Sequence, residues 1–362
     1  MKKKIIAVHL FNDYSGSPLV FKNVLKGLLS SGYKIDLFIS GNNKGFLSEI
    51  NGINYKYFRY IYGNLKVLTL IKFLYSQAII FFKLLRYNRN EHLLYVNTIL
   101  PFGALLAGKL LGISIICHLH ETSIKPRLLK NFLLWVVGFC AKEVIYVSNY
   151  LSKQDQINPL YKNVVYNALS DEFINKSLQK YPTINGKFRI LMLSSLKQYK
   201  GIDEFVKLST KMPNYDFELV LNTKSEHIKA YFGELNIPNL KVYPVQKNTH
   251  AFYERAHLVL NLSHPEKWIE TFGMTVLEAM SYGTPVIVPP IGGITELVEN
   301  GINGFKLDQR KLNQIERVIR LIRTDLKLFN KLSINAKVKS HEFSIQKQQK
   351  QISIILDRLQ YA

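Results

Sequence analysis

Residues 265–287 read PEKWIETFGMTVLEAMSYGTPVI. The glycines and the proline delimit a helix, which should begin near Thr271–Gly273 and end before Gly283, because Pro285 cannot continue it. The short apolar run 285–288 follows at once and is typical of a buried strand. A helix followed so closely by a buried strand favours an α/β fold.

Two carboxylates stand at a fixed spacing in this stretch. Glu270 would lie at the mouth of the helix and Glu278 roughly 12 Å further along the axis, at about 1.5 Å per residue. An extended sugar–diphosphate–ribose has similar dimensions, so one carboxylate could bind sugar hydroxyls and the other ribose hydroxyls. The amides of Phe272, Gly273 and Met274 could hold the diphosphate at the positive end of the helix dipole. Taken alone, the two carboxylates fit better an acidic helix cap and an ordinary exposed glutamate.

Short apolar runs alternate with helical patterns along the whole chain. This alternation predicts parallel sheets with crossover helices. The first half predicts strands at 4–10, 33–40, 93–96, 114–119, 144–147 and 163–166, and helices at 18–30, 66–86, 101–111 and 127–141. The second half predicts strands at 188–196, 217–221, 241–243, 258–262 and 285–288, a helix at 202–211, and a last helix of about 15 residues capped by Ser344.

The polar stretch 171–187, which contains Pro182 and Gly186, is the expected linker. It separates domains at residues 1–170 and 188–340, and residues 341–362 should form a helix that packs back toward the first domain. Open α/β sheets bind ligands beyond the carboxyl ends of their strands. Functional side chains are therefore expected in the loops that follow strands in both domains, facing each other across a cleft.

The net charge of the 362 residues is +22, and 21 basic against 7 acidic side chains place +14 of it in residues 1–170. Such an excess indicates nucleic acid, a phosphorylated substrate or an acidic membrane face, or only the general solubility of a basic protein. Cys117 and Cys140 lie in apolar stretches without metal-like spacing, which fits a reducing cytosol. The basic N-terminus is better interpreted as a first strand than as a signal peptide, so a cytoplasmic location is expected.

Two apolar stretches with basic edges, 72–86 and 125–135, predict that the first half docks on the cytoplasmic face of an anionic membrane. The alternative is that both helices are buried against the sheet. A different class of function is also open, because one aromatic cluster could bind nucleic acid: Tyr55, Tyr57, Phe58, Arg59, Tyr60 and Tyr62.

The 265–305 region resembles the signature of retaining glycosyltransferases of family four. Glu270 and Glu278 match the family's Glu, seven residues, Glu motif, and Gly283-Thr284-Pro285, Gly292-Gly293 and Asn300-Gly301 stand in place around them. The resemblance implies a GT-B fold of two Rossmann-like domains. The domain at 1–170 would bind the acceptor, and the domain at 188–340 would bind the nucleotide sugar.

Other positions match the family more weakly. Lys200 with Gly201 occupies the place of a phosphate-binding loop, but Ser195 stands where the family has an arginine, so Lys197 is the nearest substitute. Gly16 resembles the glycine of the N-terminal loop, whose backbone approaches the phosphate. His120 followed by Glu121 resembles the family's cleft motif beside the anomeric centre.

The resemblance implies a hexosyl- or deoxyhexosyl-transferase that retains the anomeric configuration and requires no metal or other cofactor. Glu270 would orient the sugar, Glu278 the ribose, and Lys200 would neutralise the leaving diphosphate, with no protein nucleophile. The acceptor would be a glycan or a lipid-linked glycan in cell-surface polysaccharide biosynthesis, and nucleic acid is not expected as a partner. Another GT-B enzyme, such as a nucleotide-sugar epimerase, remains an alternative.

Overall fold

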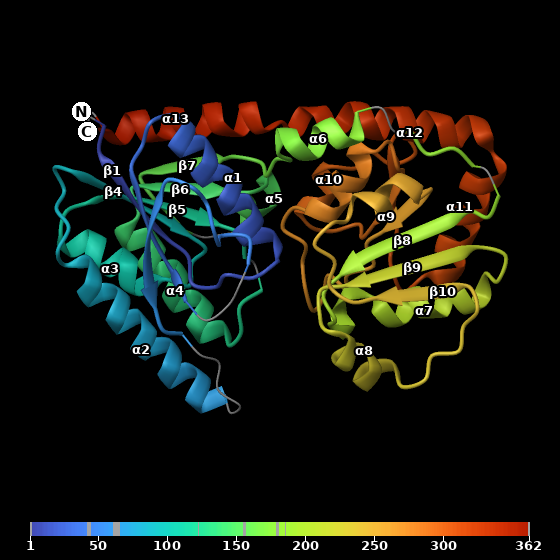
Figure 1. Ribbon diagram of the computed structural model, residues 1–362, viewed down its shortest axis with the longest axis horizontal. Helices are drawn as coiled ribbons and strands as arrows, with labels where there is room; N and C mark the ends of the chain where they lie inside the picture. Colours follow the sequence, from blue (N-terminus) through green and yellow to red (C-terminus); the bar gives the residue numbers. More distant parts are fainter. Residues whose placement is uncertain are drawn as a thin grey trace. The chain divides into compact units, whose positions relative to one another are not determined.

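The chain forms two compact units, each built on its own parallel sheet (Figure 1). The computed structural model describes residues 2–41, 45–60, 66–121, 123–154, 157–178, 181–184 and 186–360. Unit 1 comprises Met1–Asn167 and Ile345–Ala362, and unit 2 comprises Ala168–Ser344.

Unit 1 contains a seven-stranded sheet in the order β3-β2-β1-β4-β5-β6-β7. Its strands are β1 (Lys4–Val8), β2 (Ile35–Ser40), β3 (Ile53–Phe58), β4 (His92–Asn97), β5 (Ser114–Leu119), β6 (Glu143–Tyr146) and β7 (Tyr161–Val164). The helices are α1 (Gly16–Ser30), α2 (Lys66–Leu84), α3 (Phe102–Leu110), α4 (Arg127–Cys140), α5 (Asn149–Gln154) and α13 (Ile345–Gln360). All six pairings are parallel, and the central strands are almost wholly buried because the sheet has helices on both faces.

The last helix of the chain belongs to the core of unit 1. Ile352, Ile355, Leu356 and Leu359 of α13 pack with the buried side chains of α1 and of the sheet. Arg358 adds an ion pair with the buried Glu143 at 3.2 Å. The chain therefore returns to its first unit after the second is complete.

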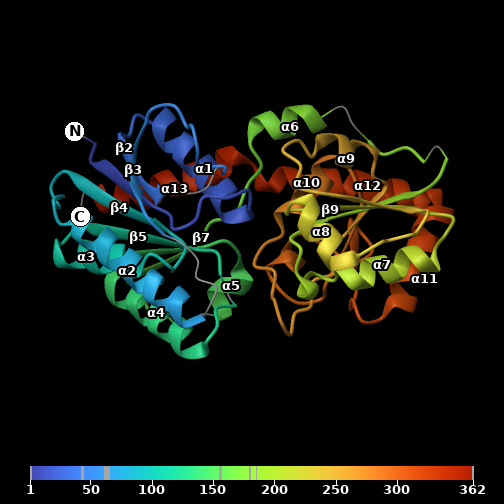
Figure 2. The same cartoon turned by 60° about the horizontal axis from the view of Figure 1, so that its bottom comes forward.

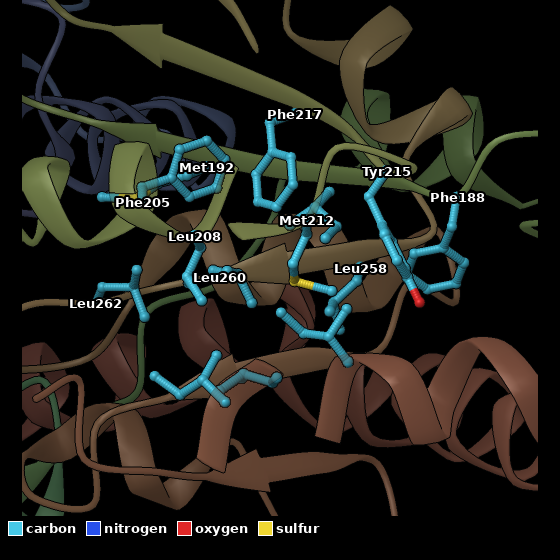
Figure 3. Close-up of a cluster of buried hydrophobic side chains, with 14 of the residues drawn as sticks. Phe188, Met192, Phe205, Leu208, Met212, Tyr215, Phe217, Leu258, Leu260 and Leu262 are labelled. Atoms are coloured by element: carbon cyan, nitrogen blue, oxygen red, sulfur yellow. The ribbon is translucent and has the colours of Figure 1, made fainter. Parts of the chain in front are cut away.

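Unit 2 contains a six-stranded parallel sheet in the order β10-β9-β8-β11-β12-β13. Its strands are β8 (Arg189–Ser194), β9 (Asp216–Leu221), β10 (Leu240–Tyr243), β11 (Leu258–Leu260), β12 (Val286–Val288) and β13 (Gly304–Lys306). The helices are α6 (Asp171–Ser177), α7 (Ile202–Lys211), α8 (Ser225–Phe232), α9 (His250–Arg255), α10 (Met274–Ser281), α11 (Leu312–Thr324) and α12 (Leu326–Ser340). Figure 3 shows its core, where Phe205 and Phe217 meet edge to face between α7 and β9.

The two parallel α/β sheets confirm the fold class predicted from the sequence, and the order of β3 to β6 is that of a doubly wound Rossmann sheet. The structure differs from the sequence-based prediction in several local elements, and among the helices α5, α8, α9, α11 and α12 were not predicted. The predicted linker 171–187 contains α6, because the Ser170 side chain accepts a hydrogen bond from the amide of Phe173 and caps a helix there. The strands β3 and β13 were not predicted.

The aromatic cluster at 55–62 is mostly the edge strand β3 and the residues after it. Phe58 and Tyr60 are buried, whereas Tyr57 is exposed and stacks on Tyr55. Tyr62 lies outside the described residues. The cluster is therefore divided between core and surface and does not form the single aromatic face predicted for a nucleic-acid platform.

Candidate active site

Three loops of unit 2 follow neighbouring strands and carry most of the predicted residues. Lys200 ends a short 3₁₀ turn after β8, Glu270 lies in the loop after β11, and Gly292 follows β12. Because β8, β11 and β12 are adjacent and parallel, their carboxyl ends meet at one edge of the sheet. The fold thus brings together residues that are 70 positions apart in the sequence.

An ion pair forms the centre of this site. The Nζ atom of Lys200 lies 2.5 Å from Oε1 of Glu270, and Ser263 donates a hydrogen bond to the same oxygen at 2.8 Å. Burial alone would raise the pKa of Glu270, but the charge of Lys200 and the hydrogen bonds to the carboxylate outweigh it and lower the pKa below its usual 4.5. Glu270 is therefore held as an anion beside a cation.

An aromatic pair, absent from the sequence-based prediction, borders this ion pair. Trp268 stacks on Tyr199 with ring centroids 5.4 Å apart, and Nζ of Lys200 lies 4.8 Å from the centre of the Trp268 ring. The ring face attracts the ammonium group and helps to fix its position. The position of Trp268, two residues before Glu270, was the only signal in the sequence.

Two glycines set the close approach of these loops. Gly201 and Gly292 have φ values of 79° and 117°, which favour glycine. A Cβ on Gly201 would lie 2.2 Å from the carbonyl oxygen of Leu262, and a Cβ on Gly292 would lie 2.6 Å from that of Glu270. Both glycines therefore let one loop pack directly on the backbone of the loop that carries Glu270.

Glu278 is placed differently from the prediction. The helix α10 begins at Met274, so Glu270 lies outside it, and the axial rise from Met274 to Glu278 is only about 6 Å. The 12 Å spacing along one helix was therefore wrong. Nor is Glu278 an ordinary exposed residue, since it is buried and accepts a hydrogen bond from the hydroxyl of Tyr253 at 2.6 Å.

The N-terminus of α10 lies between the two glutamates in the sequence. Gly273 caps the helix in a left-handed conformation without a side-chain hydrogen bond, and the first-turn amides of a helix have no intrahelical acceptor. Met274 begins the helix, whereas the Phe272 ring is buried against Phe343. Phe272 can therefore contribute only backbone atoms to a ligand.

The loop after β8 brings only one of its two lysines to Glu270. The carbonyl oxygen of Ser195 accepts a hydrogen bond from the amide of Lys197 at 2.8 Å. Within the described residues, the Lys197 side chain is exposed and takes no part in the contacts of Glu270. Lys197 is therefore not part of the Glu270 ion pair, and its role as a substitute for the family's arginine stays a prediction.

In unit 1, His120 lies directly after β5 in a cluster of buried polar groups. Its Nε2 atom is 2.9 Å from the side-chain oxygen of Asn97, and its ring contacts that of His118. Asn97, which is fully buried, also contacts the Nδ1 atom of His9 at 3.1 Å. The sequence had pointed to His120, but not to Asn97 at the end of β4, which links it to His9.

Burial controls the charge of this cluster. It lowers the pKa of His9 to about 4 and that of His118 to about 3, and it lowers the pKa of His120 well below 6.5, aided by the two neighbouring histidines. The pKa of Glu121 rises to about 7, again through burial and against hydrogen bonds from backbone amides. His120 is therefore neutral near pH 7.

Backbone strain occurs beside this histidine cluster in unit 1. Thr98, which follows Asn97, has a φ of 76°, an unfavourable value for a β-branched residue. Such strain is frequent at functional sites.

Gly16 begins α1, and a Cβ at this position would meet nothing within 4 Å, so no described part of the chain requires glycine there for space.

Replacing Glu278 with Gln should change the pH dependence of stability. Burial raises the pKa of Glu278 to about 7 from its usual 4.5. Between these values the folded protein keeps a proton that the unfolded chain has lost, so this group lowers stability as the pH rises. The free energy of unfolding of the variant, relative to the wild type, should rise by up to about 1.4 kcal/mol per pH unit in that window.

Urea unfolding at several pH values measures this difference. The variant must be compared with the wild type because burial lowers the pKa values of His9 and His118, so these two groups raise the free energy of unfolding as the pH rises. The Gln amide oxygen can still accept the hydrogen bond from Tyr253, and any weakening of this bond should add a constant offset without a slope. Glu226→Gln, at an exposed position, is the matched control, and a variant as flat as this control would contradict the burial of Glu278 as an acid.

The described site lies within a region that known proteins share. Residues 173–339 match the family model of glycosyl transferases, group 1. The match includes Lys200, Ser263, Glu270 and Glu278, all of them at the geometry given above. Over these residues the chain is similar to the group 1 glycosyltransferases.

The likeness to known proteins extends beyond residues 173–339. An uncharacterized glycosyltransferase of Haemophilus influenzae is 22% identical over 356 residues, which are 96% of this chain and 98% of the relative. A D-inositol 3-phosphate glycosyltransferase of Paenarthrobacter aurescens is 24% identical over 174 residues, 45% and 42% of the two chains. The crystal structure of Anabaena HepE with UDP-glucose superposes with a TM-score of 0.79 at 20% identity, covering 98% of this chain and 99% of that one. This likeness shows the GT-B fold.

Proposed function

We propose that the protein is a retaining glycosyltransferase that transfers a hexosyl or deoxyhexosyl group from a nucleoside diphosphate sugar. The observation that carries this proposal is the Lys200–Glu270 pair at the carboxyl edge of the unit 2 sheet, with the N-terminus of α10 following in the same loop. A cation and helix amides suit a diphosphate, and a fixed carboxylate suits sugar hydroxyls. The HepE structure was obtained with UDP-glucose, which supports a donor of this class.

Different residues of the site would bind different parts of the donor. Lys200 and the first amides of α10 would bind the diphosphate and neutralise the charge that develops as it leaves. Glu270 would accept hydrogen bonds from the sugar. Glu278 uses Oε2 for the Tyr253 hydroxyl, so Oε1 would accept a ribose hydroxyl. No protein nucleophile is assigned, and the leaving diphosphate would assist attack on the same face of the sugar.

Unit 1 would supply the acceptor side of the reaction. A neutral His120, whose Nε2–H group donates to the side-chain oxygen of Asn97, keeps Nδ1 free to accept a hydrogen bond from a substrate hydroxyl without adding positive charge. The open space at Gly16 would admit a close approach of phosphate to the start of α1. We assign a glycan or lipid-linked acceptor in cell-surface polysaccharide biosynthesis, at the cytoplasmic face of the membrane.

A ligand screen followed by product analysis tests the proposal. Nucleoside diphosphates and their sugars should raise the melting temperature, because a ligand selective for the folded state stabilises it. The best donor should then be consumed with release of the nucleoside diphosphate and retention at the anomeric carbon. Interconversion of two nucleotide sugars without release would indicate an epimerase instead, and no stabilisation by any of them would reject the donor site.

Turnover should be independent of divalent metal. Lys200 and the amides of α10 would already neutralise the diphosphate, which is the task a metal performs in other transferases. Activity in excess EDTA should stay within about twofold of that with magnesium, because removing the metal would change neither the binding of the donor nor that of the transition state. Loss of turnover in EDTA, restored by magnesium, would contradict this expectation.

A further inference from the structure

Three neighbouring helices cover one face of the unit 1 sheet, opposite α1 and α13 (Figures 1 and 2). The helix α3 lies between α2 and α4 and packs on both. Large apolar side chains stand exposed along the outer two: Val67, Ile71, Tyr75 and Phe82 on α2, and Leu128 and Trp135 on α4. We call the outer surface of α2, α3 and α4 the α2–α4 face.

The helix α2 is apolar on its exposed side as well as on its buried side. Tyr75 and Phe82 are 65% and 68% exposed, whereas Ser76 and Gln77 are buried together with the apolar side chains of Phe73, Ile80 and Leu84. The side-chain oxygen of Gln77 accepts a hydrogen bond from the amide of Gly103 at 3.1 Å. A surface helix normally turns its apolar side inward. The outward side of α2 is apolar as well, so this exposed apolar stripe requires an environment other than water.

The charges of the α2–α4 face identify that environment. The three helices contain six Lys or Arg residues and no Asp or Glu. A second copy of the same face would bring like charges together, which is unfavourable. An anionic lipid surface instead complements both properties, because it attracts the cations and accepts the apolar side chains.

The structure indicates that α2 lies along such a surface and does not cross it. Val67–Leu84 is long and apolar enough to span a membrane, with a mean hydropathy of 1.6. However, 28% of this segment is buried inside the protein, and the Gln77–Gly103 hydrogen bond ties its middle to α3. On α4, Trp135 stacks on Phe139, an aromatic pair typical of the membrane–water interface.

We propose that the α2–α4 face docks unit 1 onto an anionic lipid bilayer, with α2 and α4 lying in the interface. This proposal goes beyond sugar transfer and stands without it, because its test measures lipid binding alone. The protein should sediment with vesicles of phosphatidylcholine and phosphatidylglycerol, bind those of phosphatidylcholine alone far more weakly, and be released in part by salt.

Tryptophan fluorescence places the contact. The chain has two tryptophans, so Trp268→Phe leaves Trp135 as the only one. Its emission should shift to the blue on anionic vesicles and be quenched by brominated lipid, because the exposed ring would enter the interface. Binding without this shift would place the lipid contact elsewhere and overturn the proposal.

Matched variants separate the apolar and basic parts. Ile71→Ser with Tyr75→Ser should abolish most binding, whereas Val338→Ser with Ile354→Ser, at exposed apolar positions on α12 and α13, should not. Lys125→Gln with Arg127→Gln should weaken binding on the order of fivefold per charge. The control Lys327→Gln with Lys331→Gln, on α12, should have little effect.

Two further results would overturn the proposal. The first is no sedimentation of the wild type with anionic vesicles at low salt. The second is self-association that depends on protein concentration, is lost in the Ile71→Ser, Tyr75→Ser variant and occurs without vesicle binding, which would assign the face to a second copy. Analytical ultracentrifugation of the wild type and this variant distinguishes them.

Discussion

Lys200→Ala should lower turnover by about a hundred- to a thousandfold, the usual effect of removing one group that stabilises charge in the transition state. We expect a loss at the upper end of this range because Ser195, which stands where the family has an arginine, carries no positive charge that could stabilise the diphosphate in place of Lys200. The measurement is kcat for donor hydrolysis or transfer. Binding of the nucleoside diphosphate should weaken less than turnover, since charge on the diphosphate grows as the sugar leaves.

The Lys200→Ala variant also loses the partner of Glu270, so stability must be measured beside activity. Leaving a charged hydrogen-bonding group unpaired costs about 1.5–3 kcal/mol, which lowers the melting temperature without unfolding the protein. Lys197→Ala, three residues earlier and exposed, is the control and should keep nearly full turnover. Turnover of Lys200→Ala within a fewfold of the wild type, in a folded protein, would remove Lys200 from the site.

Glu270→Gln and Glu278→Gln should have different kinetic effects. Glu270→Gln should lower turnover roughly ten- to hundredfold with little change in nucleoside diphosphate affinity, because its proposed partner is the sugar. Glu278→Gln should weaken that affinity by a similar factor, because the ribose remains after the sugar leaves. Calorimetry with the nucleoside diphosphate and steady-state kinetics measure the two effects.

Tyr253→Phe provides the matched control for the glutamate pair. It removes the hydrogen bond to Glu278 but keeps the carboxylate and the ring, so its effect on affinity should be smaller than that of Glu278→Gln. If both glutamate variants change affinity and turnover in the same proportion, the division of the donor between them is wrong.

The sequence predicted the strands and helices of both sheets well where the apolar runs were continuous, as in Ser114–Leu119 and Ile202–Lys211. It did not predict β3, because an edge strand is half exposed and its tyrosines resembled a binding cluster. Nor did it predict β13, whose three residues follow a turn and are too few for a pattern. Ser170 followed by two acidic residues was a readable start signal for α6 within the predicted linker.

The candidate site was predictable only as a set of residues, and its contacts were not. Lys200 and Glu270 could be named from local motifs, but their ion pair depends on the adjacency of β8 and β11, which no local pattern encodes. The burial of Glu278 depends on Tyr253 in a different helix. Asn97 belongs to no local sequence motif. Its role arises only because the fold brings His9, after β1, close to His118 and His120, in and after β5.

The return of α13 to unit 1 has a consequence for synthesis on the ribosome. Unit 2 is one continuous segment, whereas the core of unit 1 needs Ile352, Ile355 and Leu359 from α13, which follows unit 2 in the chain. Domains generally fold as units as the chain emerges. Although unit 1 begins first, its core therefore stays incomplete until α13 has been made, and we expect unit 2 to be the first to reach its native state.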